Sequence, residues 1–124
     1  VNYSDFLSET LPFNYDFFNQ IFIVTSSKDT DTIKFCKKYK KIRCIISDAF
    51  FLNGDPFNKG RGFNEILKLA PRNHWITILD SDILLPPNFL DLARQHITDI
   101  NNIYTLKRKY VKDKKELDAL IDSN

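Results

Sequence analysis

One stretch of the chain decides the fold: Trp75-Ile76-Thr77-Ile78-Leu79-Asp80-Ser81-Asp82. Its first five residues are apolar or β-branched, which favours a short strand with both faces buried, as at the centre of a parallel sheet. Two carboxylates one residue apart, Asp80 and Asp82, follow at once. Open α/β sheets bind their ligands beyond the carboxyl ends of the strands, so we expect a ligand site here. The alternative is that the two acids only cap a turn.

Asp80 and Asp82 are also candidate metal ligands. Two like charges this close repel each other unless a cation or hydrogen-bond donors compensate them. Hard divalent ions prefer oxygen ligands and complete their coordination shell with phosphate oxygens. We therefore expect Mn²⁺ or Mg²⁺ as the cofactor of this site.

Outward from this stretch, the apolar pattern alternates between strand and helix. Further strands are expected at residues 21–25, 43–47 and 102–106, and helices at residues 4–11, 31–41, 63–70, 89–97 and 114–121. Pro12 is expected to end the first helix, with Phe6 and Leu7 facing inward. Asp29 or Thr30 is a suitable cap for the second helix. Strand–helix–strand repeats of this length imply crossover connections and a mostly parallel central sheet.

Length and composition narrow the class of protein. The 124 residues include eleven Phe, five Tyr and one Trp, which favours a single packed domain over disorder. With 18 basic and 16 acidic residues the net charge is only +2, so the total predicts no nucleic-acid partner. Basic residues crowd the segment 107–115. Such a run is usually a solvated face, and the less favoured alternative is contact with a membrane surface.

Two cysteines, Cys36 and Cys44, lack metal-ligand spacing and indicate buried, reduced thiols. No apolar run approaches the roughly 20 residues of a membrane-spanning helix. The chain also opens without the pattern of a signal peptide. These features together favour a cytoplasmic protein.

A second candidate site is Asn58-Lys59-Gly60-Arg61-Gly62, at the expected start of the helix that contains residues 63–70. Glycines let backbone amides approach a ligand, and a helix N-terminus favours anions. Two cations here, with carboxylates at a strand end nearby, suit a metal-bound diphosphate. The alternative is an ordinary glycine-rich helix start with two solvated cations. The spacing matches neither the P-loop nor the dinucleotide-binding fingerprint.

The order of these segments resembles that of the GT-A-fold glycosyltransferases, in particular the family-two-like group. The resemblance covers about residues 1–110, and its motifs are Ile21–Thr25, Asp29-Thr30-Asp31-Thr32, Asn58-Lys59-Gly60-Arg61-Gly62-Phe63-Asn64 and Leu79-Asp80-Ser81-Asp82. It implies a three-layer α/β fold with helices on both faces of the mostly parallel sheet. It also implies an enzyme that transfers sugar from a nucleotide-diphospho-sugar donor to a glycan, lipid or protein acceptor.

The same resemblance assigns roles to single residues. Asp82 matches the ligand of the metal that bridges the diphosphate, and Asp80 matches the acid turned toward the ribose or the metal shell. The family often has an Asp where Thr25-Ser26 stands, so the base preference stays open. The other residues that fall where such enzymes contact the nucleotide are Tyr3, Ser26, Asn58, Lys59 and Arg61.

The resemblance also places the acceptor half, with its general base, beyond residue 124. We therefore expect a chain of one domain, residues 1–124, truncated at both ends, that binds donor without appreciable sugar transfer. A sheet edge left open by a missing first strand would favour homodimers. Two alternatives remain: a sugar nucleotidyltransferase, although no glycine-rich signature follows the first strand, and a non-catalytic module that binds nucleotide or glycan.

Overall fold

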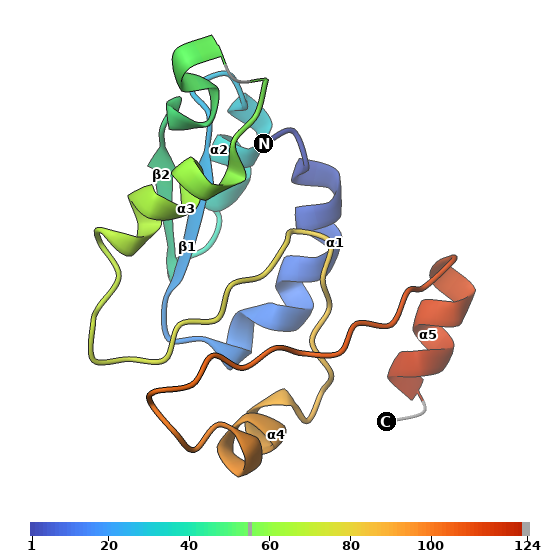
Figure 1. Cartoon of the computed structure of the whole chain (residues 1–124). Coiled ribbons are helices and arrows are strands. Elements are labelled where there is room, and N and C mark those ends of the chain that lie inside the picture. Colours follow the sequence, from blue (N-terminus) through green and yellow to red (C-terminus); the bar gives the residue numbers. More distant parts are fainter. Residues whose placement is uncertain (55, 123–124) are drawn as a thin grey trace. The chain divides into compact units, whose positions relative to one another are not determined.

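The computed structural model describes residues 1–54 and 56–122, and the side chains among them up to residue 119. The chain divides into two compact units, Val1–Leu84 and Leu85–Asn124, which are described separately. Figure 1 shows the elements of both. The first unit contains α1 (Ser4–Asn14), the 3-10 helix η1 (Tyr15–Phe17), β1 (Ile21–Thr25), α2 (Thr30–Cys36), β2 (Ile42–Ile46), the 3-10 helix η2 (Ala49–Gly54) and α3 (Lys59–Leu67).

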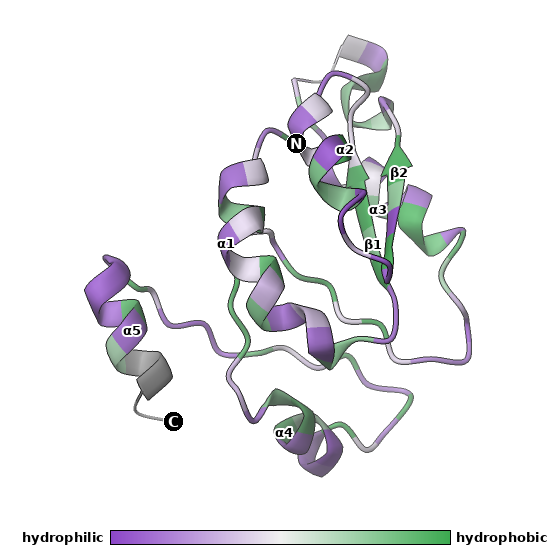
Figure 2. Cartoon of the chain, turned by 180° about the vertical axis from the view of Figure 1, so that it is seen from behind, coloured by the Kyte–Doolittle hydropathy of each residue, from purple (hydrophilic) through white to green (hydrophobic). Residues whose placement is uncertain are grey.

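The centre of the first unit is a β1–α2–β2 arrangement with two parallel strands. Ile21 lies opposite Ile42 and Thr25 opposite Ile46, and β2 thus begins one residue before the predicted strand. Both strands are predominantly hydrophobic (Figure 2). In Figure 1, α3 crosses in front of β1 and α2 lies behind the strands. The α/β class expected from the alternating pattern is therefore confirmed, with two strands among the described residues.

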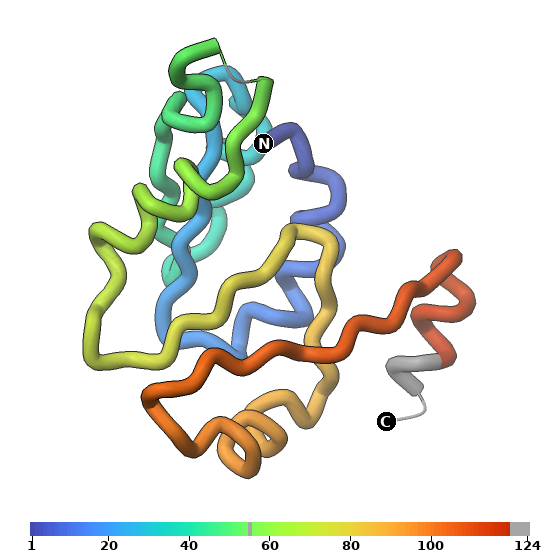
Figure 3. The backbone as a smooth tube through the Cα atoms, in the orientation of Figure 1, coloured from blue at the N-terminus to red at the C-terminus, as the bar shows by residue number. Residues whose placement is uncertain are grey.

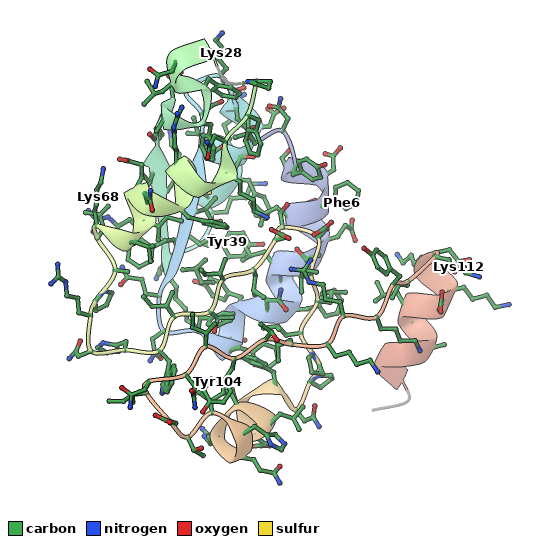
Figure 4. All side chains as sticks on the ribbon, viewed as in Figure 1. Phe6, Lys28, Tyr39, Lys68, Tyr104 and Lys112 are labelled. Carbon is green, nitrogen blue, oxygen red and sulfur yellow. The ribbon has the colours of Figure 1, made fainter. Side chains whose placement is uncertain are left out.

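Helix α1 extends past Pro12, so the prediction that this proline ends the helix is wrong. A proline here removes only the bond to the carbonyl of Ser8, and because both residues are exposed, water can satisfy that carbonyl. Phe6, predicted to face inward, is exposed and points away from the strands (Figure 4). The buried face of α1 consists of Leu7, Thr10, Leu11 and Asn14.

Residues 75–79 form no strand, and the prediction of a central third strand is wrong for this structure. The segment follows an irregular path, and the Trp75 side chain is 54 % exposed (Figure 3). A strand exists only through the backbone hydrogen bonds that it shares with a neighbour. Apolar, β-branched composition favours such pairing but does not supply the partner.

The second unit contains α4 (Phe89–His96) and α5 (Lys114–Asp122), close to the predicted helices. Residues 102–106 form no strand, contrary to expectation. Instead, the Tyr104 hydroxyl accepts hydrogen bonds from the amides of Asp99 and Thr98, at 2.9 and 3.2 Å. Within the part of the chain that the structure describes, no helix has the length and apolar character needed to cross a membrane.

Candidate functional site

The Asp80-x-Asp82 segment lies in a turn that α1 holds in place. The Ile83 amide donates to the Asp80 carbonyl at 3.2 Å and closes the turn. The Thr10 hydroxyl donates to the Ser81 carbonyl at 2.7 Å, and the Asn14 side-chain amide donates to the Ile83 carbonyl at 2.7 Å. Figure 3 shows this part of the chain passing beside α1. The turn is therefore fixed by side chains from a distant helix.

Sequence reasoning missed the roles of Thr10 and Asn14, although a signal was present. Both side chains lie on the same helical stripe as Leu7 and Leu11, and they are only 7 % and 6 % exposed. Polar residues buried in an apolar stripe need hydrogen-bond partners. Their spacing of i and i+4 placed two donors one turn apart on the buried face.

At the start of α3, Asn58 serves as the N-cap. Its side-chain oxygen accepts a hydrogen bond from the Arg61 amide at 3.2 Å, and its own amide donates to the Phe50 carbonyl at 2.8 Å. The side chain of Asn58 therefore caps α3, and the expectation that Asn58 contacts the nucleotide stays a prediction. The cap thus fixes the first turn of α3, which carries Lys59.

Lys59 and Asp80, two of the predicted site residues, form an ion pair across two elements. Lys59 contributes from the first position of α3, and Asp80 from the turn held by α1. The side chains are 51 % and 29 % exposed, so water and small solutes reach the pair. Asp82 is exposed, and none of the hydrogen bonds or ion pairs found among the described residues involves its carboxylate.

The two glycines of α3 have different surroundings. Phe50, which is buried, lies directly on Gly62, and its ring would overlap any Cβ placed there. Gly62 therefore serves the packing of Phe50. The expectation that the glycines of this helix start let backbone amides approach a ligand stays a prediction. Beside Gly60 the nearest atom to an added Cβ is the Asn58 side-chain oxygen at 3.4 Å. The Arg61 guanidinium donates to the carbonyl of Leu52 in η2.

The carboxyl ends of β1 and β2 are joined by side chains. The Asp48 carboxylate accepts hydrogen bonds from the Ser27 amide at 2.9 Å and from the Ser27 hydroxyl at 2.7 Å. These hydrogen bonds lower the pKa of Asp48, and the bond from the Ser27 hydroxyl has the larger effect. Ser26, expected to contact the nucleotide, is only 2 % exposed, whereas its neighbour Ser27 is exposed.

Asp29 is a buried carboxylate beside the same strand end. It caps α2 by accepting from the Thr32 amide at 3.3 Å, as predicted, and also accepts from the Thr25 hydroxyl and the Asn2 amide, both at 2.7 Å. Burial by itself raises the pKa of Asp29, but these hydrogen bonds outweigh it and lower the pKa overall. The Asn2 bond brings its neighbour Tyr3 to this end of β1, where Tyr3 precedes α1 and is exposed.

The two thiols are free, and Cys36 is fully buried in α2. Burial, followed by the adjacent Cys44 thiol, raises the pKa of Cys36 to about 12. Such a thiol stays protonated and unreactive at neutral pH. The expectation of a buried, reduced cysteine is confirmed for Cys36, whereas Cys44 is half-buried.

The carboxylates of the turn at Asp80–Ile83 have some of the properties that a divalent ion requires. Two acids on one turn, one of them exposed, suit an ion such as Mg²⁺ that keeps several waters and takes further oxygens from a phosphate. Within residues 1–54 and 56–122, no group of three or more His, Cys, Asp or Glu side chains is arranged to hold a metal. Asp80 and Asp82 thus offer at most two carboxylates, and the other ligands of such an ion would have to come from water or from a phosphate.

The contacts form two groups: Asn58, Lys59 and Asp80 around the start of α3, and Tyr3, Ser26, Ser27 and Asp48 around the strand ends. The first group brings one ammonium and one carboxylate together at a helix N-terminus. Comparison with models of known protein families, with curated proteins and with solved structures gave no match.

Proposed function

We propose that this chain binds a nucleotide-diphospho-sugar as the donor-binding part of a glycosyltransferase with a three-layer, mostly parallel GT-A fold. The proposal rests chiefly on the ion pair between Lys59 and Asp80. It joins the start of α3 to the turn at Asp80–Ile83, two segments that were expected on separate grounds to share a diphosphate. Helices α2 and α3 on either side of the strands support the fold (Figures 1 and 2).

In this proposal each residue around the start of α3 has a defined task. Lys59 and the amides of the first helical turn attract the diphosphate, because a helix N-terminus carries partial positive charge. Asp82, with Asp80, holds Mn²⁺ or Mg²⁺. When bound, the ion stabilises the charge that develops on the departing nucleoside diphosphate. The acceptor is a glycan, lipid or protein.

The experiment that tests the proposal is titration calorimetry of UDP with and without Mn²⁺, on wild type and Asp82→Ala. We expect wild type to bind UDP more tightly with Mn²⁺, because few carboxylates hold such an ion without phosphate oxygens. In Asp82→Ala the effect of Mn²⁺ should be lost. GDP and CDP are titrated in the same way, because the sequence does not decide which nucleotide base the chain prefers.

Asp91→Ala is the matched control, since Asp91 is an exposed acid that pairs only locally with Arg94 on α4. It should behave as wild type. Equal UDP affinity for wild type and Asp82→Ala, with and without Mn²⁺, would contradict the proposal. If wild type binds UDP with the same affinity with and without Mn²⁺, a non-catalytic nucleotide-binding module would be favoured instead.

A further inference from the structure

Lys59 lies between the start of α3, where the diphosphate is proposed to bind, and Asp80, a proposed metal ligand. Its ammonium contacts the Asp80 carboxylate and lies 5.5 Å from the centre of the Phe63 ring. Asn58 fixes the helix from which Lys59 extends, and Thr10 fixes the turn that carries Asp80. Because both partners sit on separately anchored elements, their meeting is a property of the tertiary structure rather than of one flexible loop.

The ammonium and a divalent ion compete for the same carboxylate. An Asp80 oxygen in contact with Lys59 is a poor metal ligand until the ammonium leaves, since two cations cannot share it without repulsion. Lys59 is able to leave, because its side chain is half exposed and carries its charge on a flexible four-carbon stem.

A diphosphate at the start of α3 offers the ammonium a second anion within reach of the same helix position. We propose that Lys59 is a latch on the metal site: it holds Asp80 in the free protein and transfers to the diphosphate when the nucleotide binds, which exposes Asp80 to the ion. The latch rests on the proposed function, and it makes Lys59 a positioning residue that couples the two ligands.

The coupling has a consequence for each ligand taken alone. Mn²⁺ without nucleotide must displace the ammonium, so its affinity is lowered by the ion pair. Nucleotide diphosphate draws the ammonium away, so its presence raises the affinity for Mn²⁺. Because such coupling is reciprocal, Mn²⁺ raises the affinity for the nucleotide by the same factor.

Titration calorimetry of Mn²⁺ alone, of UDP alone and of UDP at saturating Mn²⁺ tests the latch in the full chain. In Lys59→Met we expect Mn²⁺ alone to bind about threefold to fivefold tighter, the range that losing an exposed ion pair allows. UDP alone should bind about tenfold more weakly, because a charge-assisted contact to phosphate is lost. The factor by which each ligand assists the other should shrink.

Two further variants separate the latch from a general effect of charge. Lys68→Met removes a lysine of the same helix region that pairs with Glu65 and points away from the strands (Figure 4). It should leave both affinities near those of wild type. In an Asp80→Asn background, Lys59→Met should no longer raise the affinity for Mn²⁺.

The latch is overturned if Lys59→Met binds Mn²⁺ no better than Lys68→Met, or if the gain persists in the Asp80→Asn background. If neither wild type nor any variant binds UDP, GDP or CDP, the proposed function is overturned. The Mn²⁺ titrations then still decide whether Lys59 and the ion compete for Asp80, so the two failures are distinguishable.

Discussion

At the scale of single residues, Gly62 and Asp29 show how packing and hydrogen bonding give a residue its role. Gly62 has no side chain because the ring of Phe50 fills that space. Asp29 keeps its charge while buried because Thr25, Asn2 and Thr32 donate to it. Each residue leads to a prediction that a single substitution tests.

We expect Gly62→Ala to destabilise the protein by about 1–3 kcal/mol, the cost typical of overpacking a filled site. The added methyl group displaces the buried Phe50 ring. Gly60→Ala is the matched control on the same helix, because an added Cβ there meets only the Asn58 oxygen at 3.4 Å. The free energy of unfolding in urea measures both, and equal values for the two variants would contradict the packing argument.

The lowered pKa of Asp29 predicts how stability depends on pH. A carboxyl group whose pKa is lower in the folded protein than its ordinary value of 3.8 stabilises the fold at higher pH. This contribution is complete above the pKa of the unfolded chain and is lost as the pH falls through the pKa of the folded protein. We therefore expect the free energy of unfolding to decrease below about pH 4.

Asp29→Asn should flatten that decrease and cost about 1–3 kcal/mol at neutral pH, because a buried charge-assisted network is broken. Asp48→Asn is the control for an exposed carboxylate whose pKa is also lowered. Urea denaturation between pH 3 and pH 7 is the measurement, the pH limits being set around the ordinary Asp pKa of about 4. An unchanged pH profile in Asp29→Asn would show that other groups control acid stability.

At the scale of elements, α1 acts as a support for the turn at Asp80–Ile83. Thr10 and Asn14 donate to the carbonyls of Ser81 and Ile83, so the carboxylates of the turn are positioned by a helix near the other end of the same unit. Part-buried carbonyls that lose their hydrogen-bond donor cost free energy, which makes the support testable.

We expect Thr10→Val to destabilise the protein by about 1–2 kcal/mol, because it keeps the shape but leaves the Ser81 carbonyl without its donor. It should also weaken the Mn²⁺-dependent binding of UDP, since the turn that positions the Asp80 and Asp82 carboxylates loses one of its two supports from α1. Ser8→Ala on the same helix removes only an exposed bond to the Asp5 carbonyl and should be near neutral. Urea denaturation and calorimetry report the two effects separately.

At the scale of the whole molecule, one edge of β1 and the exposed apolar residues Trp75, Ile76 and Ile78 are the features that favour self-association. In β1, Ile21 and Thr25 direct their backbone bonds to the β2 side, so Phe22 and Val24 direct theirs to the opposite edge. Among the described residues the sheet has only β1 and β2, so no further strand pairs with that edge of β1. A strand edge to which no further strand is added, together with exposed apolar residues, favours pairing with a second chain.

We propose that two copies of the chain associate through this edge, and we expect the sedimentation coefficient to rise with protein concentration. Ile78→Lys should reduce the association, because Ile78 is among the exposed apolar residues of the segment 75–79. Ile103→Lys, at a still more exposed position in the second unit, is the control and should not change it. Association that is unchanged in Ile78→Lys would place the contact elsewhere.

The sequence by itself determined the features whose causes are local. The apolar runs of β1 and β2, the Asp29 cap of α2 and the periodicity of α3 and α4 lie within a few residues of the structure they produce. Hydrophobic periodicity and helix capping depend on residues within one or two helical turns of each other, so the sequence alone predicts them.

Only the tertiary structure decided which of these segments meet. The bonds from Thr10 and Asn14 to the turn join residues 71 and 69 positions apart, and such partners leave no local pattern. The same holds for Phe50 on Gly62 and for Lys59 on Asp80. Residues 75–79 show the converse, because strand composition becomes a strand only when folding places a neighbour beside it, and pairing is a property of two segments.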